Sequence, residues 1–584
     1  MNKFVSYIVF SIAATSLFAQ SDSLETQPEV IIIKTADIPV MNAVKMTNNP
    51  SIEDSIIPAP EIVYGVVKKQ IPVTFKIDPI KPARMKGEPL NSLSKGYMKG
   101  GYGNYNNTMF EGYLNNVRSR KHSVGASVQH FASQGGINDV GYSGFSHNSA
   151  SLFGKKFLKK HLLQGELNYD RDALRYYGYN PEEYSAYDKD NTKQWFSKSG
   201  ADIRLMSFIK DSTKLNYTPN LSYYNLLDKG GLMENNGKLS VSFRKYYTPK
   251  DSSIITDQVI RLHTSFDYNN FYNGIEAKGN GIFMLHPHVT ASGEKFRINF
   301  GGSMFIEGFE NTASFHFYPN AHIKYNVLRD MLIPYAGIKG GIERTNYNSL
   351  TSENPFLVTY SAMLNKKTPY DAYGGVRGAF SSKMAFNIMG SRKRIVNMPF
   401  FVNRYDLGFN VDLNGDINYY RWGGSTFNVI YDTVAVTTID AQLSYITTEK
   451  INVIARGEYY MYQLQNEVEA WHMPDWKATV SGTYNIKNKI IVRADIFAIS
   501  ERKALGYDST STYIGIDDIG VSMFTQKLPW IIDINLGIEY FYNKKVSAFV
   551  NFNNIAAMNY YEWNKYPSQG FNIMGGLSYS FWEK

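Results

Sequence analysis

The sequence predicts a transmembrane antiparallel β-barrel of about 22 strands, with about 14–20 strands as an alternative that the pattern leaves open. Three observations support this fold class. Apolar and polar residues alternate from about residue 94 to the end of the chain. Short turns alternate with long, polar and aromatic connections. After residue 19 no apolar run approaches the roughly 18 residues that a membrane-spanning helix needs.

The first 19 residues are predicted to be a secretory signal peptide. Lys3 supplies a positive charge, and the residues from Phe4 to Ala19 form an apolar core. We expect cleavage after Ala19. The chain has no cysteine, which excludes both a lipid anchor on a thiol and a disulfide framework. With the predicted barrel, export points to the outer membrane of a Gram-negative cell.

Residues 20–93 have a different texture from the rest of the chain. Prolines recur from Pro28 to Pro89, and the short apolar bursts between them show no helical period. We therefore expect an irregular, partly extended periplasmic segment. The predicted organisation is a signal peptide at 1–19, this segment at 20–93, and the barrel at 94–584.

The excess of basic residues does not indicate a nucleic-acid partner. Lys and Arg exceed Asp and Glu by 61 to 52, for a net charge of +9. The densest basic stretches, "RSRKH" and "GKKFLKKH", lie between alternating segments and not on a helix or in an RNA-binding motif. Charged turns in water explain them, and contact with anionic lipid head groups is the alternative.

The strands are clearest near the C-terminus. In "WIIDINLGIEYFY" the apolar residues fall on every second position, and a short turn at 543–545 leads to a second alternating run at 546–552. A similar hairpin turns at Lys487-Asn488. Fainter copies include "KHSVGASVQH", "GKLSVSFRKYY", "VIRLHTSFDYNN" and "FRINFGGSMF".

The last strand, in "FNIMGGLSYSFWEK", needs partners on both edges, because an unpaired edge promotes aggregation. The predicted partners are the strand at 546–552 and the first strand, near "KGYMKGGYGNY". Pairing with the first strand would close the sheet into a barrel.

Charged residues on the polar face of the strands are predicted to line the lumen, because they would be costly against lipid. Two explanations stay open: the charges neutralise one another across a closed lumen, or they line a path for polar solutes. The candidate lumen-lining residues are Arg456, Glu458, Arg493, Asp495, Asp533 and Glu539.

The stretch "VNFNNIAAMNYYEWNKYPSQGFNIMGGLSYSF" resembles the closing hairpin of TonB-dependent receptor barrels of Bacteroidetes-type bacteria. The spacing of Gly576, Tyr579 and Phe581 is similar to the C-terminal signal that the barrel-assembly machinery reads. The resemblance implies a solute receptor that this machinery inserts. The family also carries a globular plug domain behind a TonB-binding box. Residues 20–93 are too few for such a plug, so we expect no standard plug-gated, energised transport.

Neither catalysis nor a metal is expected. His147 and Ser149 have the His-x-Ser spacing of outer-membrane phospholipases, but no catalytic context surrounds them, and two polar residues on one strand face explain the pattern. His286 and His288 share a strand face without a third ligand in view. We expect no enzyme, no catalytic residue, no metal and no cofactor.

Two functions remain in view. The leading hypothesis is an outer-membrane barrel that binds or passes a solute. The alternative is a non-catalytic accessory subunit of an outer-membrane complex for protein assembly or secretion. The expected partners are outer-membrane lipid, the barrel-assembly machinery and other outer-membrane or periplasmic proteins.

Overall fold

The computed structural model describes residues 94–582 except 117–118, 120, 183–189, 191, 210–213, 248–253, 273–276, 310–311, 329–330, 359–362, 405–409, 412–416, 419–424, 448–449 and 509–521. The signal peptide with its cleavage after Ala19, and the segment at 20–93, lie outside the described residues.

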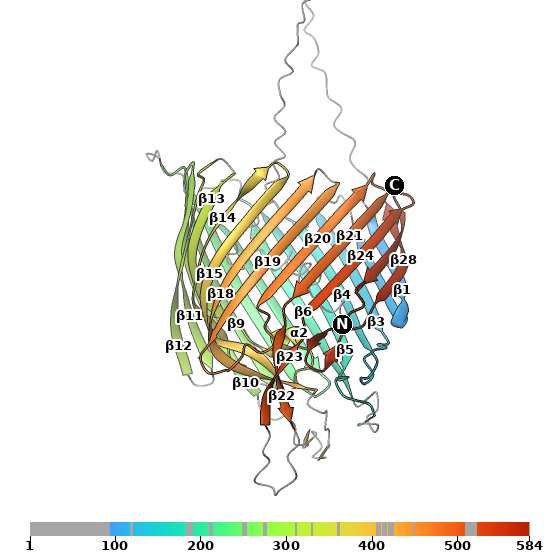
Figure 1. Cartoon of the computed structure of the whole chain (residues 1–584). Helices are drawn as coiled ribbons and strands as arrows, with labels where there is room; N and C mark the ends of the chain where they lie inside the picture. Colours follow the sequence, from blue (N-terminus) through green and yellow to red (C-terminus); the bar gives the residue numbers. More distant parts are fainter. Residues whose placement is uncertain are drawn as a thin grey trace, which may run out of the picture. The chain divides into compact units, whose positions relative to one another are not determined.

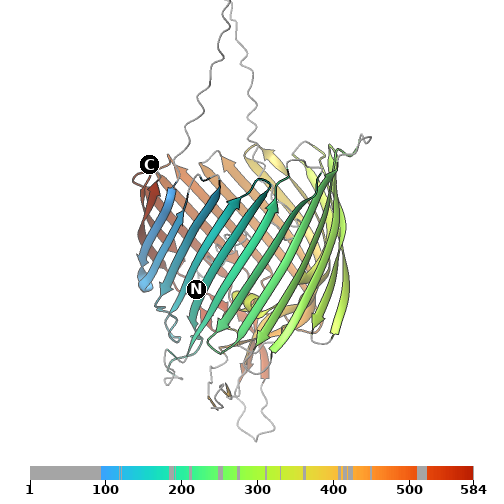
Figure 2. The same cartoon turned by 180° about the vertical axis from the view of Figure 1, so that it is seen from behind.

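The chain forms one closed antiparallel sheet of 22 strands, seen from two sides in Figures 1 and 2. This confirms the predicted fold class and strand number. The bounds are β1 (Ser94–Gly103), β2 (Asn107–Asn115), β3 (His122–Ser133), β4 (Phe145–Phe157), β5 (His161–Arg175), β6 (Lys193–Ser207), β7 (Asn216–Asp228), β8 (Met233–Tyr247), β9 (Asp257–Tyr272), β10 (Ala277–Ser292), β11 (Phe296–Phe309), β12 (Thr312–Tyr325), β13 (Ile333–Glu343), β14 (Lys366–Ser381), β15 (Met384–Asn403), β18 (Phe427–Thr447), β19 (Ile451–Leu464), β20 (Trp476–Ile486), β21 (Ile490–Ile499), β24 (Ile531–Phe541), β25 (Val546–Asn553) and β28 (Asn572–Trp582).

The last strand closes the barrel. β28 pairs with β25 on one edge and with β1 on the other, where Gly576 lies opposite Gly101. Both predicted partners are therefore confirmed. A closed sheet has no exposed edge, and every strand can satisfy its backbone hydrogen bonds within the sheet.

The outer face of the sheet is apolar. On β12, for example, Phe315 and Phe317 are 66% and 57% exposed, and on β11 Phe300 is 70% exposed. Residues of the opposite parity point to the interior, because side chains alternate across a strand. A closed sheet with an apolar exterior is the arrangement that lets strands cross a lipid bilayer.

Helices play a small part in the described chain. They are η1 (Asn104–Asn106) and α2 (Tyr347–Glu353). No helix in the described ranges is long and apolar enough to cross a membrane.

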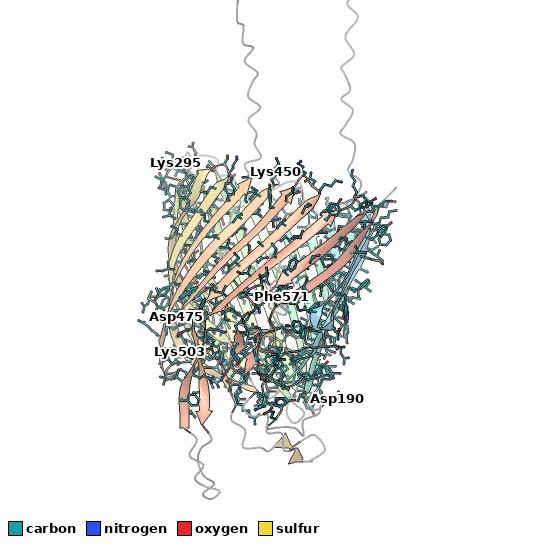
Figure 3. All side chains as sticks on the ribbon, turned by 45° about the vertical axis from the view of Figure 1, so that its right-hand side comes forward. Asp190, Lys295, Lys450, Asp475, Lys503 and Phe571 are labelled. Carbon is teal, nitrogen blue, oxygen red and sulfur yellow. The ribbon has the colours of Figure 1, made fainter. Side chains whose placement is uncertain are left out.

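The two rims of the barrel differ. The turn rim carries short connections such as 158–160, 293–295 and 487–489. The predicted turn at Lys487-Asn488 is confirmed, and both residues have positive φ. The loop rim carries the long connections. Figure 3 shows Lys295 and Lys450 at the turn rim and Asp190 and Lys503 at the loop rim.

The long connections do not surround the whole loop rim. Between β7 and β12 the loop-rim connections are short, at 229–232, 273–276 and 310–311. Three of the longer connections contain short strands of their own, which are β16 (Asn410–Val411), β17 (Ile417–Asn418), β22 (Arg502–Asp508), β23 (Ser522–Leu528), β26 (Tyr561–Trp563) and β27 (Tyr566–Pro567). β22 and β23 form a ribbon that projects from the loop rim (Figure 1).

Candidate functional site

Three connections at the loop rim pack against the inner wall of the barrel. They are the helix loop (344–358, with α2), the 465–475 loop, and the closing loop (554–571, with β26 and β27), and we call them together the cap. The largest buried apolar cluster of the described chain joins the helix loop and the closing loop to residues of the wall. Its members include Leu174, Phe196, Leu226, Phe271, Tyr347, Leu350, Phe356, Leu357, Phe401, Phe427, Trp563 and Tyr566.

The helix loop begins with a local helix signal. The Asn346 side chain accepts a hydrogen bond from the Ser349 backbone N–H (2.9 Å), and the Ser349 hydroxyl accepts one from the Asn346 N–H (2.9 Å). This reciprocal capping box starts α2. Glu234 of β8, which is fully buried, accepts hydrogen bonds from the N–H groups of Tyr347 (2.7 Å) and Asn348 (3.2 Å). A carboxylate at a helix N-terminus stabilises the helix there.

Ion pairs hold both flanks of the helix loop to the wall. Arg344 Nε lies 2.6 Å from an Asp267 carboxylate oxygen on β9. After the loop, Asn365 donates to Glu307 of β11 (2.7 Å), and the Lys367 ammonium also lies 2.7 Å from Glu307. The helix loop is therefore attached to β9 and β11, whose own connections at the loop rim are short.

Tyr566 lies at the centre of the cap and is fully buried. Its ring stacks on Phe356 of the helix loop, with 3.6 Å between ring centroids, and meets Tyr177 edge-on at 4.9 Å. Its hydroxyl donates to the Ser425 carbonyl (2.5 Å). One side chain of the closing loop thus joins three other connections of the loop rim.

Polar contacts fasten the rest of the closing loop. Gln569 donates to the Ser133 hydroxyl (2.9 Å) and the Gly135 carbonyl (2.8 Å) at the end of β3. Tyr560 donates to Asp533 of β24 (2.8 Å). Arg502 donates to the carbonyls of Glu562 (2.7 Å) and Tyr561. The closing loop is therefore bonded to β3 and β24, on either side of the strands that it connects, and to β22.

His472 connects the 465–475 loop to the closing loop. Its Nδ1–H donates to the Phe401 carbonyl (2.8 Å), and its Nε2 accepts from the Asn564 N–H (3.3 Å). These two bonds require the neutral imidazole. Burial, together with the nearby Arg502 guanidinium, lowers the pKa of His472 to about 3.

The predicted lumen-lining residues fall into three arrangements. Arg456 donates to Asp440 (2.8 Å) and lies 3.0 Å from Glu458, and Arg493 lies 3.2 Å from Glu539. Asp495 is exposed on β21. Asp533 is fully buried and holds Tyr560 of the closing loop, so it belongs to the anchoring of the cap.

The histidines considered for chemistry have other partners. His147 hydrogen-bonds Asp172 through Nδ1, and Ser149 lies opposite Gln129 and Asp170. His286 Nδ1 lies 2.7 Å from the Ser303 hydroxyl, and its ring is 4.8 Å from that of His288. Within the described ranges no group of three or more His, Asp or Glu side chains is arranged to hold a metal ion.

The residues of the predicted C-terminal signal lie on both faces of β28. Tyr579 and Phe581 point outward and pack edge to face, 4.7 Å between ring centroids. At Gly576 a Cβ atom would clash with the Gly100 carbonyl of β1 and the Phe549 ring of β25. Glycine at this position therefore allows both neighbours to approach β28 closely.

Sequence reasoning missed the cap residues and a group of cations on β8–β14. Loop residues give no periodic signal, so nothing marked Tyr566 or His472 as buried. The cations carried a usable signal: in "SFRKYY", "VIRLHT" and "FRINF", Arg244, Arg261 and Arg297 occupy the polar parity.

The sequence matches no protein-family model, and no curated protein matches it. Solved structures do resemble the fold. The pyoverdine outer membrane receptor FpvA from Pseudomonas aeruginosa, bound to pyoverdine, has a TM-score of 0.59 at 11% identity, over 85% of this chain and 79% of that one.

Two further structures give similar values. The FrpB iron transporter from Neisseria meningitidis has a TM-score of 0.61 at 8% identity, over 84% and 83% of the two chains. The siderophore receptor PirA from Acinetobacter baumannii has a TM-score of 0.62 at 8% identity, over 85% and 81%. This chain therefore shares the 22-strand barrel fold of these outer-membrane receptors.

Proposed function

We propose that this protein is a non-enzymatic outer-membrane barrel that binds a solute at the cell surface and passes it inward when the cap opens. The observation that carries the proposal is the cap itself: connections of the loop rim pack inside a polar, charged barrel through side-chain contacts. The likeness to receptors whose names include a siderophore or iron supports the solute-binding role.

The proposal assigns an orientation. Short turns face the periplasm in outer-membrane barrels and long loops face the outside. The turn rim would then be periplasmic and the cap would face the cell surface. Export through a signal peptide cleaved after Ala19, and insertion through Gly576, Tyr579 and Phe581 by the barrel-assembly machinery, belong to the same proposal.

In this proposal the charges of the inner wall form the polar surface along which the solute moves, without a standard plug. The lumen-lining set is the predicted one, with Asp533 assigned to anchoring the cap: Arg456, Glu458, Arg493, Asp495 and Glu539.

Conductance in planar bilayers tests the gate. The purified protein should show almost no conductance, because the cap obstructs the barrel at its loop rim. The double variant Trp563→Ala/Tyr566→Ala should conduct, since truncating a buried aromatic side chain costs about 3–5 kcal/mol of packing. Tyr561→Ala is the matched control, because Tyr561 lies on the same loop but is exposed. A folded double variant that does not conduct would contradict the proposed passage of a solute through the barrel.

One observation favours the alternative role as an accessory subunit. The β22–β23 ribbon presents Met523 and Phe524, which are 67% and 47% exposed, at the loop rim. Such apolar side chains on a projecting ribbon suit contact with another envelope protein. This role predicts a stoichiometric partner after mild detergent extraction that Met523→Asp/Phe524→Asp removes and that Lys527→Asp, on the same strand, retains.

A further inference from the structure

Exposed lysines gather at the turn rim where the strands from β18 to β25 end. The turns that join β18 to β19, β20 to β21 and β24 to β25 supply them. They are Lys450, Lys487, Lys489, Lys544 and Lys545, and we call them the lysine patch. Lys450 is labelled at this rim in Figure 3. The described residues of these turns, 450, 487–489 and 542–545, include no Asp or Glu.

Backbone hydrogen bonds place the three turns side by side. The Asn485 N–H of β20 donates to the Lys450 carbonyl (2.7 Å), and the Phe541 N–H of β24 donates to the Lys489 carbonyl (2.8 Å). The Lys545 carbonyl accepts in the same way from an N–H of β28 (2.7 Å). The next strand of the sheet therefore holds the backbone of each turn, and the lysine side chains lie together at one stretch of the rim.

The charge of the lysine patch is not neutralised by carboxylates of the described chain. Apart from Lys544, its lysines have no ion pair with another described residue. Glu539, near the end of β24, lies on the inner face, where it pairs with Arg493. Like charges on neighbouring turns repel one another. The patch therefore favours an anionic partner from outside the chain.

A second observation indicates what kind of partner this is. Exposed tyrosines lie beside the lysine patch on the outer face of the barrel. Tyr484 of β20 and Tyr540 of β24, on either side of β21, are 47% and 45% exposed, and Tyr542 of the β24–β25 turn is 69% exposed. Tyrosine and lysine together are typical of the membrane–water boundary, where the ring lies at head-group level and the ammonium reaches toward water. The patch is therefore continuous with the lipid-facing surface.

We propose that the lysine patch binds the phosphate groups of anionic phospholipids in the leaflet at the turn rim. Each ammonium group donates hydrogen bonds to phosphate oxygens and attracts their negative charge. An acidic envelope protein has a suitable charge as well, but the exposed tyrosines on the lipid-facing side favour a lipid. This inference rests on the orientation in the proposed function, which places the turn rim at the periplasmic leaflet.

Native mass spectrometry of the full-length protein in a neutral detergent tests the lipid preference. The probes are phosphatidylglycerol, which is anionic, and phosphatidylcholine, which is zwitterionic, with the same acyl chains and at equal concentrations. Bound phosphatidylglycerol should exceed bound phosphatidylcholine by about tenfold or more, because each lysine near anionic head groups contributes about fivefold. Concentrated ammonium acetate should reduce this excess by screening. Equal binding of the two lipids overturns the proposal, and an acidic protein that co-purifies in their place would assign the lysine patch to a protein.

Two double variants assign the bound lipid to the lysine patch. Lys487→Gln/Lys489→Gln should lower the ratio of bound phosphatidylglycerol to bound phosphatidylcholine by about 5- to 25-fold, the contribution of one or two lysines. Lys503→Gln/Lys527→Gln is the matched control, because it removes two lysines that lie opposite each other on the β22–β23 ribbon at the loop rim. The control should keep the wild-type ratio. A wild-type ratio in Lys487→Gln/Lys489→Gln overturns the assignment.

Labelling of an introduced cysteine decides which leaflet supplies the lipid. Ser382 is exposed in the β14–β15 turn at the same rim, and the chain has no cysteine of its own. In intact cells Ser382→Cys should resist a bulky, membrane-impermeant maleimide, and it should react once the outer membrane is permeabilised. Reaction in intact cells would overturn both the phospholipid source and the proposed orientation. A protected Ser382→Cys in a protein that binds the two lipids equally would reject the lipid site and retain the proposed function.

Discussion

Two sectors of the inner wall handle charge in opposite ways. In the sector of β18–β25, Arg456 sits between Asp440 and Glu458, and Arg493 pairs with Glu539. In the sector of β8–β14, Arg244 faces Arg261 and Arg297 faces Lys324. The first sector pairs its cations with carboxylates of neighbouring strands, whereas the second places cations directly opposite cations. An inward cation is therefore stabilised by its cross-strand neighbours in one sector and opposed by its cross-strand neighbour in the other.

The largest expected effect on the stability of the barrel itself comes from breaking the neutral sector. Arg456→Glu removes the ion pairs and places a third carboxylate beside Asp440 and Glu458, which should cost on the order of 3 kcal/mol of barrel stability. The gel-shift melting temperature in detergent measures this effect. Arg456→Met should lose less, because it adds no like charge. A wild-type melting temperature for Arg456→Glu would show that the pairing contributes nothing.

The cap offers a second test, because its closure depends on the neutral imidazole of His472. With the cap open, His472 should titrate near its ordinary pKa of 6.5, and with the cap closed its pKa is about 3. Between these values the open state binds more protons, so closure weakens as pH falls from about 6.5 to about 3, by up to about 1.4 kcal/mol per pH unit. Above pH 6.5 this contribution is constant.

Protease cleavage within the closing loop as a function of pH measures this weakening. His472→Gln removes the titrating group, so cleavage of the closing loop in this variant should depend much less on pH. The backbone hydrogen bonds of the closed sheet do not titrate, so the barrel itself should stay intact while the cap loosens. Unfolding of the barrel at the same pH at which the cap becomes cleavable would contradict the prediction that acid opens the cap alone.

The smallest expected effect comes from the cationic sector. Arg261→Glu converts an opposed cation pair into an opposite-charge pair with Arg244, which should raise stability by about 0.5–1 kcal/mol. Arg261→Gln separates the loss of repulsion from the gain of attraction. A lower melting temperature for Arg261→Glu would contradict the repulsion inferred from the register.

Local patterns predicted the wall of the barrel well. Alternation located the hairpin at Lys487-Asn488 and the pairing of β28 with β25, because pairing between strands that follow one another depends on period and turn chemistry. The pairing of β28 with β1 followed from the need to leave no open edge. The same parity placed Asp533 among inward charges, but its partner Tyr560 came from a loop, where no period exists. The parity of Arg261 was readable, yet its opposition to Arg244 depends on the register across 248–256.

The sequence by itself determined a closed barrel with an apolar exterior, because side-chain alternation and the need to satisfy every backbone group leave few alternatives in lipid. Only the tertiary structure decided which charges neutralise one another and which connections close the mouth. Tyr566 stacks on Phe356 although eight barrel strands, from β14 to β25, separate the two residues in the chain. Gln569 binds Ser133 near the start of the barrel. Such contacts arise where the closed sheet brings distant segments together, and no local pattern in the sequence records them.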